Sequence, residues 1–109
     1  SYLSRHDYLT GLGNRLLLDE EFRADKYRLS DEAKTEVSIL IFEGDGFRLL
    51  LNSYGPLTID KLIQEFSQEL IVSLEKSVRY KPSKSKIRFA EHIYRVGACK
   101  FLLVLKSTG

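Results

Sequence analysis

Two short apolar runs joined by a four-residue link constrain the fold of this chain most strongly. Residues 92–96 and 101–105 are rich in aliphatic and aromatic side chains, and they flank the stretch Gly97-Ala98-Cys99-Lys100. Two strands connected by so short a link pair as an antiparallel hairpin. The chain therefore contains a sheet, and its other apolar segments must cover that sheet.

A regular repeat of large apolar residues predicts a long amphipathic helix over residues 58–78, with Thr58 as its cap. The repeating positions are Leu62, Phe66, Leu70 and Leu74. This stripe is expected to face the core.

An earlier helix is predicted to begin after Asn14, a good N-cap residue. Its apolar side would be formed by Leu17, Leu18, Phe22 and Leu29. The polar residues 30–36 then predict a loop.

The run VSILIF, residues 37–42, predicts a strand. Because it is apolar without interruption, it is typical of a central strand covered on both faces. Residues 47–54 predict a short helix that is closed by Gly55 at its C′ position and stopped by Pro56.

The predicted order of elements is helix, strand, helix, helix, strand, strand. Interleaved helices and strands in one small chain favour the α+β class, an α/β sandwich with a layered core. A sheet of only these strands would leave one face poorly covered, so we interpret residues 1–109 as a single partial domain that is incomplete at its C-terminus.

Composition excludes several classes of function. The chain has 109 residues, a formal net charge of +2 and one cysteine. So small a charge argues against a nucleic-acid partner, and one cysteine allows no internal disulfide. No apolar run is long enough to span a membrane and no signal peptide is visible. We expect a cytoplasmic domain, with any membrane anchor placed elsewhere in a parent protein.

Three motifs carry a family resemblance. The string HDYLTGLGNR, residues 6–15, resembles the entry motif Asp-x-Leu-Thr-Gly-Leu-x-Asn-Arg of the GGDEF, or diguanylate cyclase, family. FEGDGFRLLLNSYG, residues 42–55, resembles the family's Asp-x-Asp-x-Phe-Lys…Asn-Asp…Gly stretch. YRVGACKFLLVL, residues 94–105, stands in place of Arg-Tyr-Gly-Gly-Asp-Glu-Phe and its following strand.

The resemblance covers residues 5–109 and only the N-terminal part of the family domain. It implies a nucleotidyl-cyclase or ferredoxin-like sheet with flanking helices. Family enzymes are similar to nucleotidyl cyclases: two domains each hold one GTP, paired carboxylates hold divalent metal ions, and cyclic di-GMP is formed.

By this resemblance, Glu43 and Asp45 stand at the two metal-binding positions. The alternative interpretation is a solvated strand end, or a helix N-cap at Asp45. Because the resemblance places a third metal-linked acid where this chain has Cys99, no resident cofactor is expected and Mg²⁺ would bind at most weakly.

The resemblance also implies nucleotide contacts. Leu51 stands where the family places an asparagine that recognises guanine, and Asn52 lies one position away, a rotation of about 100° on a helix. Asp60 matches the second guanine-contacting residue. Asn52 and Asp60 are therefore the predicted nucleotide-binding residues.

The turn departs most from the family pattern. Gly97 matches the first glycine, whereas Ala98 replaces the second, and Cys99 and Lys100 replace the two acids. This reversal of charge predicts a vestigial turn with no catalytic residue. On this basis the domain is expected not to be an enzyme.

Arg88 and Glu91 stand at the spacing of the family's inhibitory product site, Arg-x-x-Asp, with glutamate for aspartate. An arginine can grip a guanine edge or a phosphate with two donors. A surface ion pair on an edge strand is the equally weighted alternative, and the basic residues 79–88 are most simply a solvated loop.

The leading hypothesis is a non-catalytic regulatory or interaction module of cyclic di-GMP signalling that binds cyclic di-GMP or GTP weakly. Its partners would be a phosphodiesterase or sensor domain of a larger protein, or a second copy in a homodimer. The alternatives are a divergent but active diguanylate cyclase and a ligand-free dimerisation domain.

Overall fold

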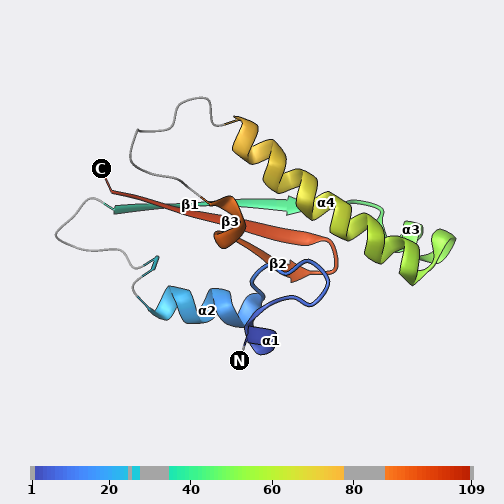
Figure 1. Ribbon diagram of the computed structural model, residues 1–109, viewed down its shortest axis with the longest axis horizontal. Helices are drawn as coiled ribbons and strands as arrows, with labels where there is room; N and C mark the ends of the chain where they lie inside the picture. Colours follow the sequence, from blue (N-terminus) through green and yellow to red (C-terminus); the bar gives the residue numbers. More distant parts are fainter. Residues whose placement is uncertain (1, 25, 28–34, 78–87, 109) are drawn as a thin grey trace.

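The computed structural model describes residues 2–24, 26–27, 35–77 and 88–108. The elements follow in the order α1 (Tyr2–Arg5), α2 (Arg15–Arg23), β1 (Thr35–Glu43), α3 (Phe47–Tyr54), α4 (Pro56–Ser77), the 3₁₀ turn η1 (Phe89–Glu91), β2 (Ile93–Gly97) and β3 (Lys100–Thr108) (Figure 1). This order confirms the predicted α+β class and adds α1 and η1.

The described strands form one antiparallel sheet in the order β1-β3-β2. β1 and β3 pair along their whole length, from Thr35 opposite Thr108 to Glu43 opposite Lys100. The predicted hairpin of β2 and β3 is confirmed, and its register shifts between Arg95 and Gly97. The β2–β3 turn therefore lies beside the carboxyl end of β1.

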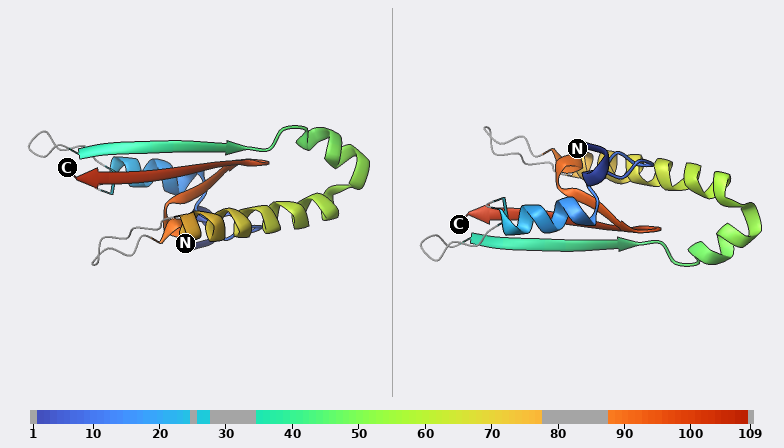
Figure 2. Two further views of the ribbon diagram at one scale, coloured as in Figure 1. Left: turned by 90° about the horizontal axis from the view of Figure 1, so that it is seen from above. Right: turned by 90° about the horizontal axis from the view of Figure 1, so that it is seen from below.

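Helices cover both faces of the sheet. Alternate residues of β3 point to opposite sides. Phe101 belongs to a core cluster with Ile63 of α4, whereas Val104 packs in a second cluster with Leu18 of α2. α4 and α2 accordingly lie on opposite sides of the sheet (Figures 1 and 2).

The structure confirms two of the predicted helix ends and corrects a third. The side chain of Asn14 accepts a hydrogen bond from the Leu17 N–H at 3.0 Å, so the predicted N-cap of α2 is confirmed. Gly55, with φ +82°, ends α3 as predicted. The long helix begins at Pro56 rather than Thr58, because the fixed φ of proline suits the first position of a helix.

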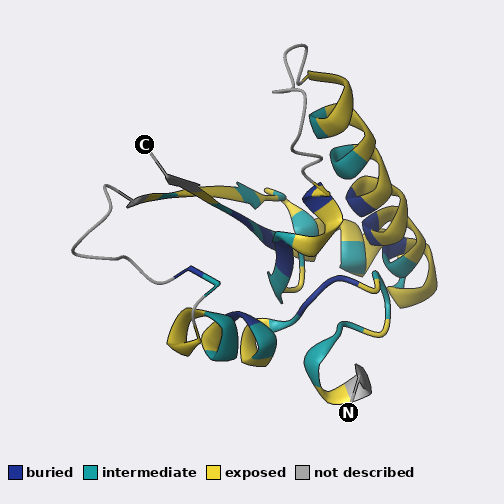
Figure 3. Cartoon of the chain, turned by 60° about the vertical axis from the view of Figure 1, so that its left-hand side comes forward, coloured by how far each residue is buried: buried dark blue, intermediate teal, exposed yellow. Residues whose placement is uncertain are grey.

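The prediction for β1 was wrong in its starting point. The strand begins at Thr35, inside the stretch predicted as a loop, and among the described residues it pairs on one side only, with β3. Its apolar side chains are exposed on both faces, as at Leu40 and Ile41 (Figure 3). Leu29 and residues 30–34 and 79–87 lie outside the described residues.

None of the helices in the described ranges is long and apolar enough to cross a bilayer.

A group of polar side chains, with Tyr27 and Tyr94 buried at its centre, joins β2 to α2 and the residues after it. The Tyr94 hydroxyl donates to a carboxylate oxygen of Glu21 and lies 2.7 Å from the Tyr27 hydroxyl. The Lys26 ammonium lies 2.6 Å from the same Glu21 oxygen. Burial and the hydrogen bond to Glu21 raise the pKa of Tyr94, so this hydroxyl stays protonated as a donor.

Tyr94→Phe is expected to lower the free energy of unfolding by about 1–3 kcal/mol, because it removes the hydrogen bonds of a buried hydroxyl to the Glu21 carboxylate and the Tyr27 hydroxyl. Urea-induced unfolding measures the change. Tyr8→Phe is the matched control, since Tyr8 is 85% exposed, and its effect should stay within about 0.5 kcal/mol. Equal effects of the two substitutions would show that the network contributes nothing to stability.

Candidate functional site

The β2–β3 turn is held against the end of β1. The Gly44 N–H donates to the Cys99 carbonyl oxygen at 2.9 Å, one residue beyond the pairing of Glu43 with Lys100. Lys100 of β3 is thus paired with Glu43 of β1, the first acid of the Glu43-Gly44-Asp45 motif. A lysine is therefore the cross-strand neighbour of a predicted metal-binding residue.

Gly44 leaves space for the Cys99 side chain. A Cβ at position 44 would lie 2.5 Å from the Cys99 Sγ, closer than such atoms approach in proteins. The side chain at position 99 therefore lies over Gly44, between the two carboxylate-bearing residues of the motif.

A pocket of about 390 Å³ opens beside the turn. Its lining residues come from α3 and the turn: Phe47, Arg48, Leu51, Asn52 and Ala98. Leu51 and Asn52 both line this pocket, although consecutive side chains on a helix point about 100° apart. The pocket thus offers one guanidinium and one amide beside apolar carbon. We call it the turn pocket.

Asp60 lies apart from these residues. It is half-buried on the second turn of α4 and does not line the turn pocket. The structure therefore brings Arg48, Asn52 and the turn together without Asp60. Sequence reasoning singled out Asn52 and gave no binding role to Arg48.

The predicted metal-binding residues are two exposed carboxylates, Glu43 and Asp45. The N-cap of α3 is Gly46, with φ +73° and no side-chain cap, so the alternative interpretation of Asp45 as that N-cap is wrong. Within the described residues, no three His, Cys, Asp or Glu side chains are grouped closely enough to hold one ion. Because divalent cations in such sites need several oxygen ligands, these residues do not form a complete metal site by themselves.

Arg88 and Glu91 lie on the surface at η1. Arg88 Nη1 is 3.8 Å from Glu91 Oε1, and the side chains are 75% and 62% exposed. So loose and exposed a pair contributes little to stability. Both side chains are accessible to a ligand.

An ion pair that sequence reasoning missed links the entry motif to the turn. Arg95 Nη1 lies 3.0 Å from Asp7 Oδ1, and each side chain is only 14% exposed. Asp7 also accepts hydrogen bonds from the N–H and hydroxyl of Thr10. Arg95 Nη2 donates to the Ala98 carbonyl oxygen at 2.8 Å. The opposite charges of Asp7 and Arg95 within two motifs were the available signal.

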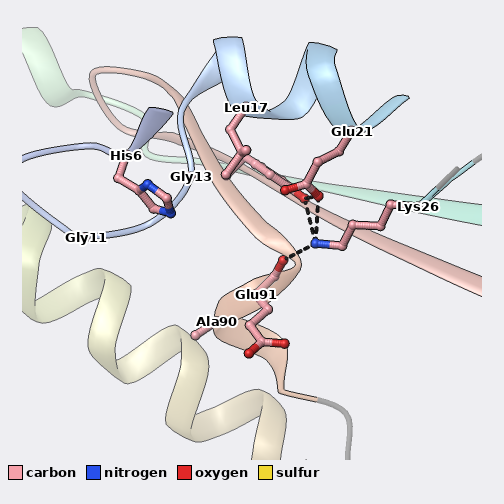
Figure 4. Close-up of a pocket in the computed structure, with 9 residues that line it drawn as sticks. His6, Gly11, Gly13, Leu17, Glu21, Lys26, Ala90 and Glu91 are labelled. Carbon is pink, nitrogen blue, oxygen red and sulfur yellow. Dashed lines mark hydrogen bonds and ion pairs between the residues drawn. The ribbon is translucent and has the colours of Figure 1, made fainter. Parts of the chain in front are cut away.

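A second pocket, of about 380 Å³, lies between the entry motif, α2 and η1 (Figure 4). Lys26 reaches across it to Glu21 and to the backbone carbonyl of Glu91, 2.9 Å away. Burial, together with the nearby Lys26 charge, lowers the pKa of His92 below its ordinary value. The Lys26 ammonium of this pocket is thus already paired with the Glu21 carboxylate.

Together the sheet, the turn and the turn pocket define an α+β domain with a pocket beside the end of its first strand. The family model described as "Diguanylate cyclase, GGDEF domain" matches residues 4–109. The chain belongs to this family, and the resemblance stated from its motifs is confirmed.

Three relatives illustrate its context. An uncharacterized protein y4lL of Sinorhizobium fredii is 40% identical over 78 residues, 70% of this chain and 9% of the relative. The bifunctional diguanylate cyclase/cyclic di-GMP phosphodiesterase MucR of Pseudomonas aeruginosa is 26% identical over 96% of this chain and 13% of its own length. Diguanylate cyclase DgcS of Shewanella oneidensis is 25% identical over 93% of this chain and 29% of its own length. The chain spans less than a third of each relative.

These comparisons correct one prediction. The domain was expected not to be an enzyme because Ala98, Cys99 and Lys100 depart from the motif. The family is one of diguanylate cyclases, and a relative aligned with nearly the whole chain bears that name. The substitutions are differences from the family motif and do not by themselves establish a loss of activity.

Proposed function

We propose that this GGDEF domain acts as a guanine-nucleotide-binding regulatory module of a longer protein in cyclic di-GMP signalling. The observation that supports the proposal is the turn pocket, whose lining includes Leu51 and Asn52, the residues that the family resemblance links to guanine recognition. The printed name of MucR joins a cyclase and a phosphodiesterase in one protein. By analogy we propose a phosphodiesterase or sensor domain as the neighbour of this one, in the cytoplasm.

The lining of the turn pocket suits a purine nucleoside triphosphate. Arg48 can donate two parallel hydrogen bonds to a phosphate. The Asn52 amide offers a donor and an acceptor to a base edge. Phe47 and Leu51 supply apolar surface for the ring. Residues of α3 could therefore contact both the phosphates and the base of the nucleotide.

Arg48→Ala is expected to weaken GTP binding by about ten- to a hundredfold, because a charge-assisted hydrogen bond contributes about 1.5–3 kcal/mol. Isothermal titration calorimetry with a non-hydrolysable GTP analogue measures the affinity. We expect Mg²⁺ to change this affinity little, since Lys100 rather than an acid is the register partner of Glu43.

Arg23→Ala is the matched control for this titration, because Arg23 is exposed at the end of α2, away from the turn pocket. The proposal fails if the wild type releases no heat with the analogue, or if Arg23→Ala weakens binding as much as Arg48→Ala.

Cyclic di-GMP binding at Arg88 and Glu91 is a second candidate function. The observation that favours it is that both side chains are exposed and only loosely paired. The arginine can contact a phosphate or guanine, and the carboxylate can accept from guanine N–H groups.

Calorimetric titration with cyclic di-GMP tests this second site. Arg88→Ala is expected to weaken binding by at least about tenfold, and Arg48→Ala to leave it unchanged because Arg48 lines a different site. Loss of binding in Arg48→Ala alone would indicate that cyclic di-GMP binds in the turn pocket. The assignment of the cyclic di-GMP site to Arg88 would then be wrong.

A further inference from the structure

The turn pocket contains few groups that could distinguish one purine base from another. Arg48 and Asn52 supply its polar side chains, and Phe47, Leu51 and Ala98 supply carbon. Arg48 would bind a phosphate, which every nucleoside triphosphate carries. The contact of a base with apolar side chains depends on its flat faces, which all bases share. Base selectivity in this pocket therefore depends on the Asn52 amide.

Selectivity for guanine over adenine requires a group that only accepts hydrogen bonds. Guanine carries two adjacent donors on its Watson–Crick edge, N1–H and the N2 amino group, whereas adenine carries one donor, the N6 amino group, beside the acceptor N1. A carboxylate can accept from both guanine donors, but it meets a lone pair at adenine N1. An amide offers both a donor and an acceptor, so Asn52 can pair with either base.

No carboxylate of the described residues lines the turn pocket. Glu43 and Asp45 lie near the turn, but their exposed side chains do not belong to the lining. Asp60 is half-buried on α4 and is also outside it. The lining thus lacks the acceptor-only group that would favour guanine.

We propose that the turn pocket binds adenine and guanine nucleoside triphosphates with comparable affinity. The proposal rests on the nucleotide binding proposed above and extends it to a second base. Leu51 lies beside Asn52 in the lining and presents only carbon to the base. It therefore occupies a position from which a carboxylate could select guanine. A module with this pocket would respond to ATP as well as to GTP.

Isothermal titration calorimetry with non-hydrolysable analogues of ATP and GTP tests the proposal. We expect the two dissociation constants to agree within about fivefold. Arg48→Ala should weaken the binding of both analogues equally, because it removes a contact to phosphate. A larger difference between the two analogues in the wild type overturns the proposal. So does an effect of Arg48→Ala on the GTP analogue alone, since Arg48 would then recognise guanine.

Leu51→Glu is expected to create guanine selectivity, because it adds an acceptor-only group to the lining. The affinity for the GTP analogue should then exceed that for the ATP analogue by at least about tenfold. Leu50→Glu is the matched control, since it makes the same change on α3 at a residue that is 41% exposed and does not line the pocket. It should keep the wild-type ratio of affinities. Circular dichroism checks that both variants are folded.

Asp60→Ala tests the alternative that Asp60 recognises guanine from outside the lining. We expect this variant to keep the wild-type ratio of affinities. A selective loss of affinity for the GTP analogue in Asp60→Ala, or an unchanged ratio in folded Leu51→Glu, overturns the proposal and leaves the proposed binding of GTP intact. A wild type that binds neither analogue refutes both proposals together.

Discussion

Replacing Cys99 with aspartate and Lys100 with glutamate is expected to raise the Mg²⁺-dependent rate of cyclic di-GMP formation from GTP by at least about tenfold. The double substitution exchanges a thiol and an ammonium for two carboxylates beside Glu43, the register partner of Lys100. The acids would supply oxygen ligands that divalent cations prefer. Product formation is followed by chromatography.

Gly44 determines whether the new aspartate fits. The Cys99 Sγ already occupies the space above Gly44, where a Cβ would come within 2.5 Å of it. Aspartate at position 99 begins along the same path and can use the same gap. Adding Gly44→Ala to the double variant should therefore abolish the gain in rate, because a methyl group closes that gap.

Lys76→Glu provides the control for charge. It makes the same change of sign on the last turn of α4, outside the turn and its pocket, and the rate should equal that of the wild type. If Cys99→Asp with Lys100→Glu leaves the rate at the wild-type level while GTP still binds, the charge of the turn does not limit the chemistry.

Asp7→Ala is expected to lower the free energy of unfolding by about 3–5 kcal/mol, the usual cost of removing one partner from a largely buried ion pair. Arg95 would lose its carboxylate at 3.0 Å and keep a charge that is only 14% exposed. Thr10 would lose its acceptor as well. Urea denaturation followed by circular dichroism measures the change.

Asp19→Ala is the matched control for Asp7→Ala. Asp19 is an exposed residue of α2, and its removal should change stability by no more than about 0.5 kcal/mol. Because Arg95 also holds the Ala98 carbonyl, Asp7→Ala should in addition weaken nucleotide binding in the turn pocket. A loss of stability no greater than that of Asp19→Ala would mean that solvent screens the Asp7–Arg95 pair.

Local patterns predicted most of the elements. Asn14 marks the start of α2 and Gly55 marks the end of α3, because caps act within one turn of a helix. The short link at Gly97 specifies the β2–β3 hairpin. These signals depend only on neighbouring residues, so they can be recognised in the sequence without knowledge of the tertiary structure.

The position of β1 could not be predicted in the same way. Its uninterrupted apolar sequence indicates that both faces of the strand are buried in the folded protein, but it does not indicate which segments bury them. Among the described residues the strand pairs on one side only, with β3.

The candidate site was predicted from motifs, but its contacts were not. The resemblance named Glu43, Asn52 and Cys99, and their functional roles stay predictions. It could not show that Arg48 lines the turn pocket or that Asp60 does not. Nor could it show the Asp7–Arg95 pair, because contacts between residues 88 apart depend on the folded chain.

The most direct test of the account is an NMR titration of the isotope-labelled chain with the GTP analogue. The account predicts the largest amide shifts at residues 44–52 and 97–100, which surround the turn pocket, and no comparable shift in α2. Shifts confined to residues 88–91, or no shift at any nucleotide concentration, would contradict it.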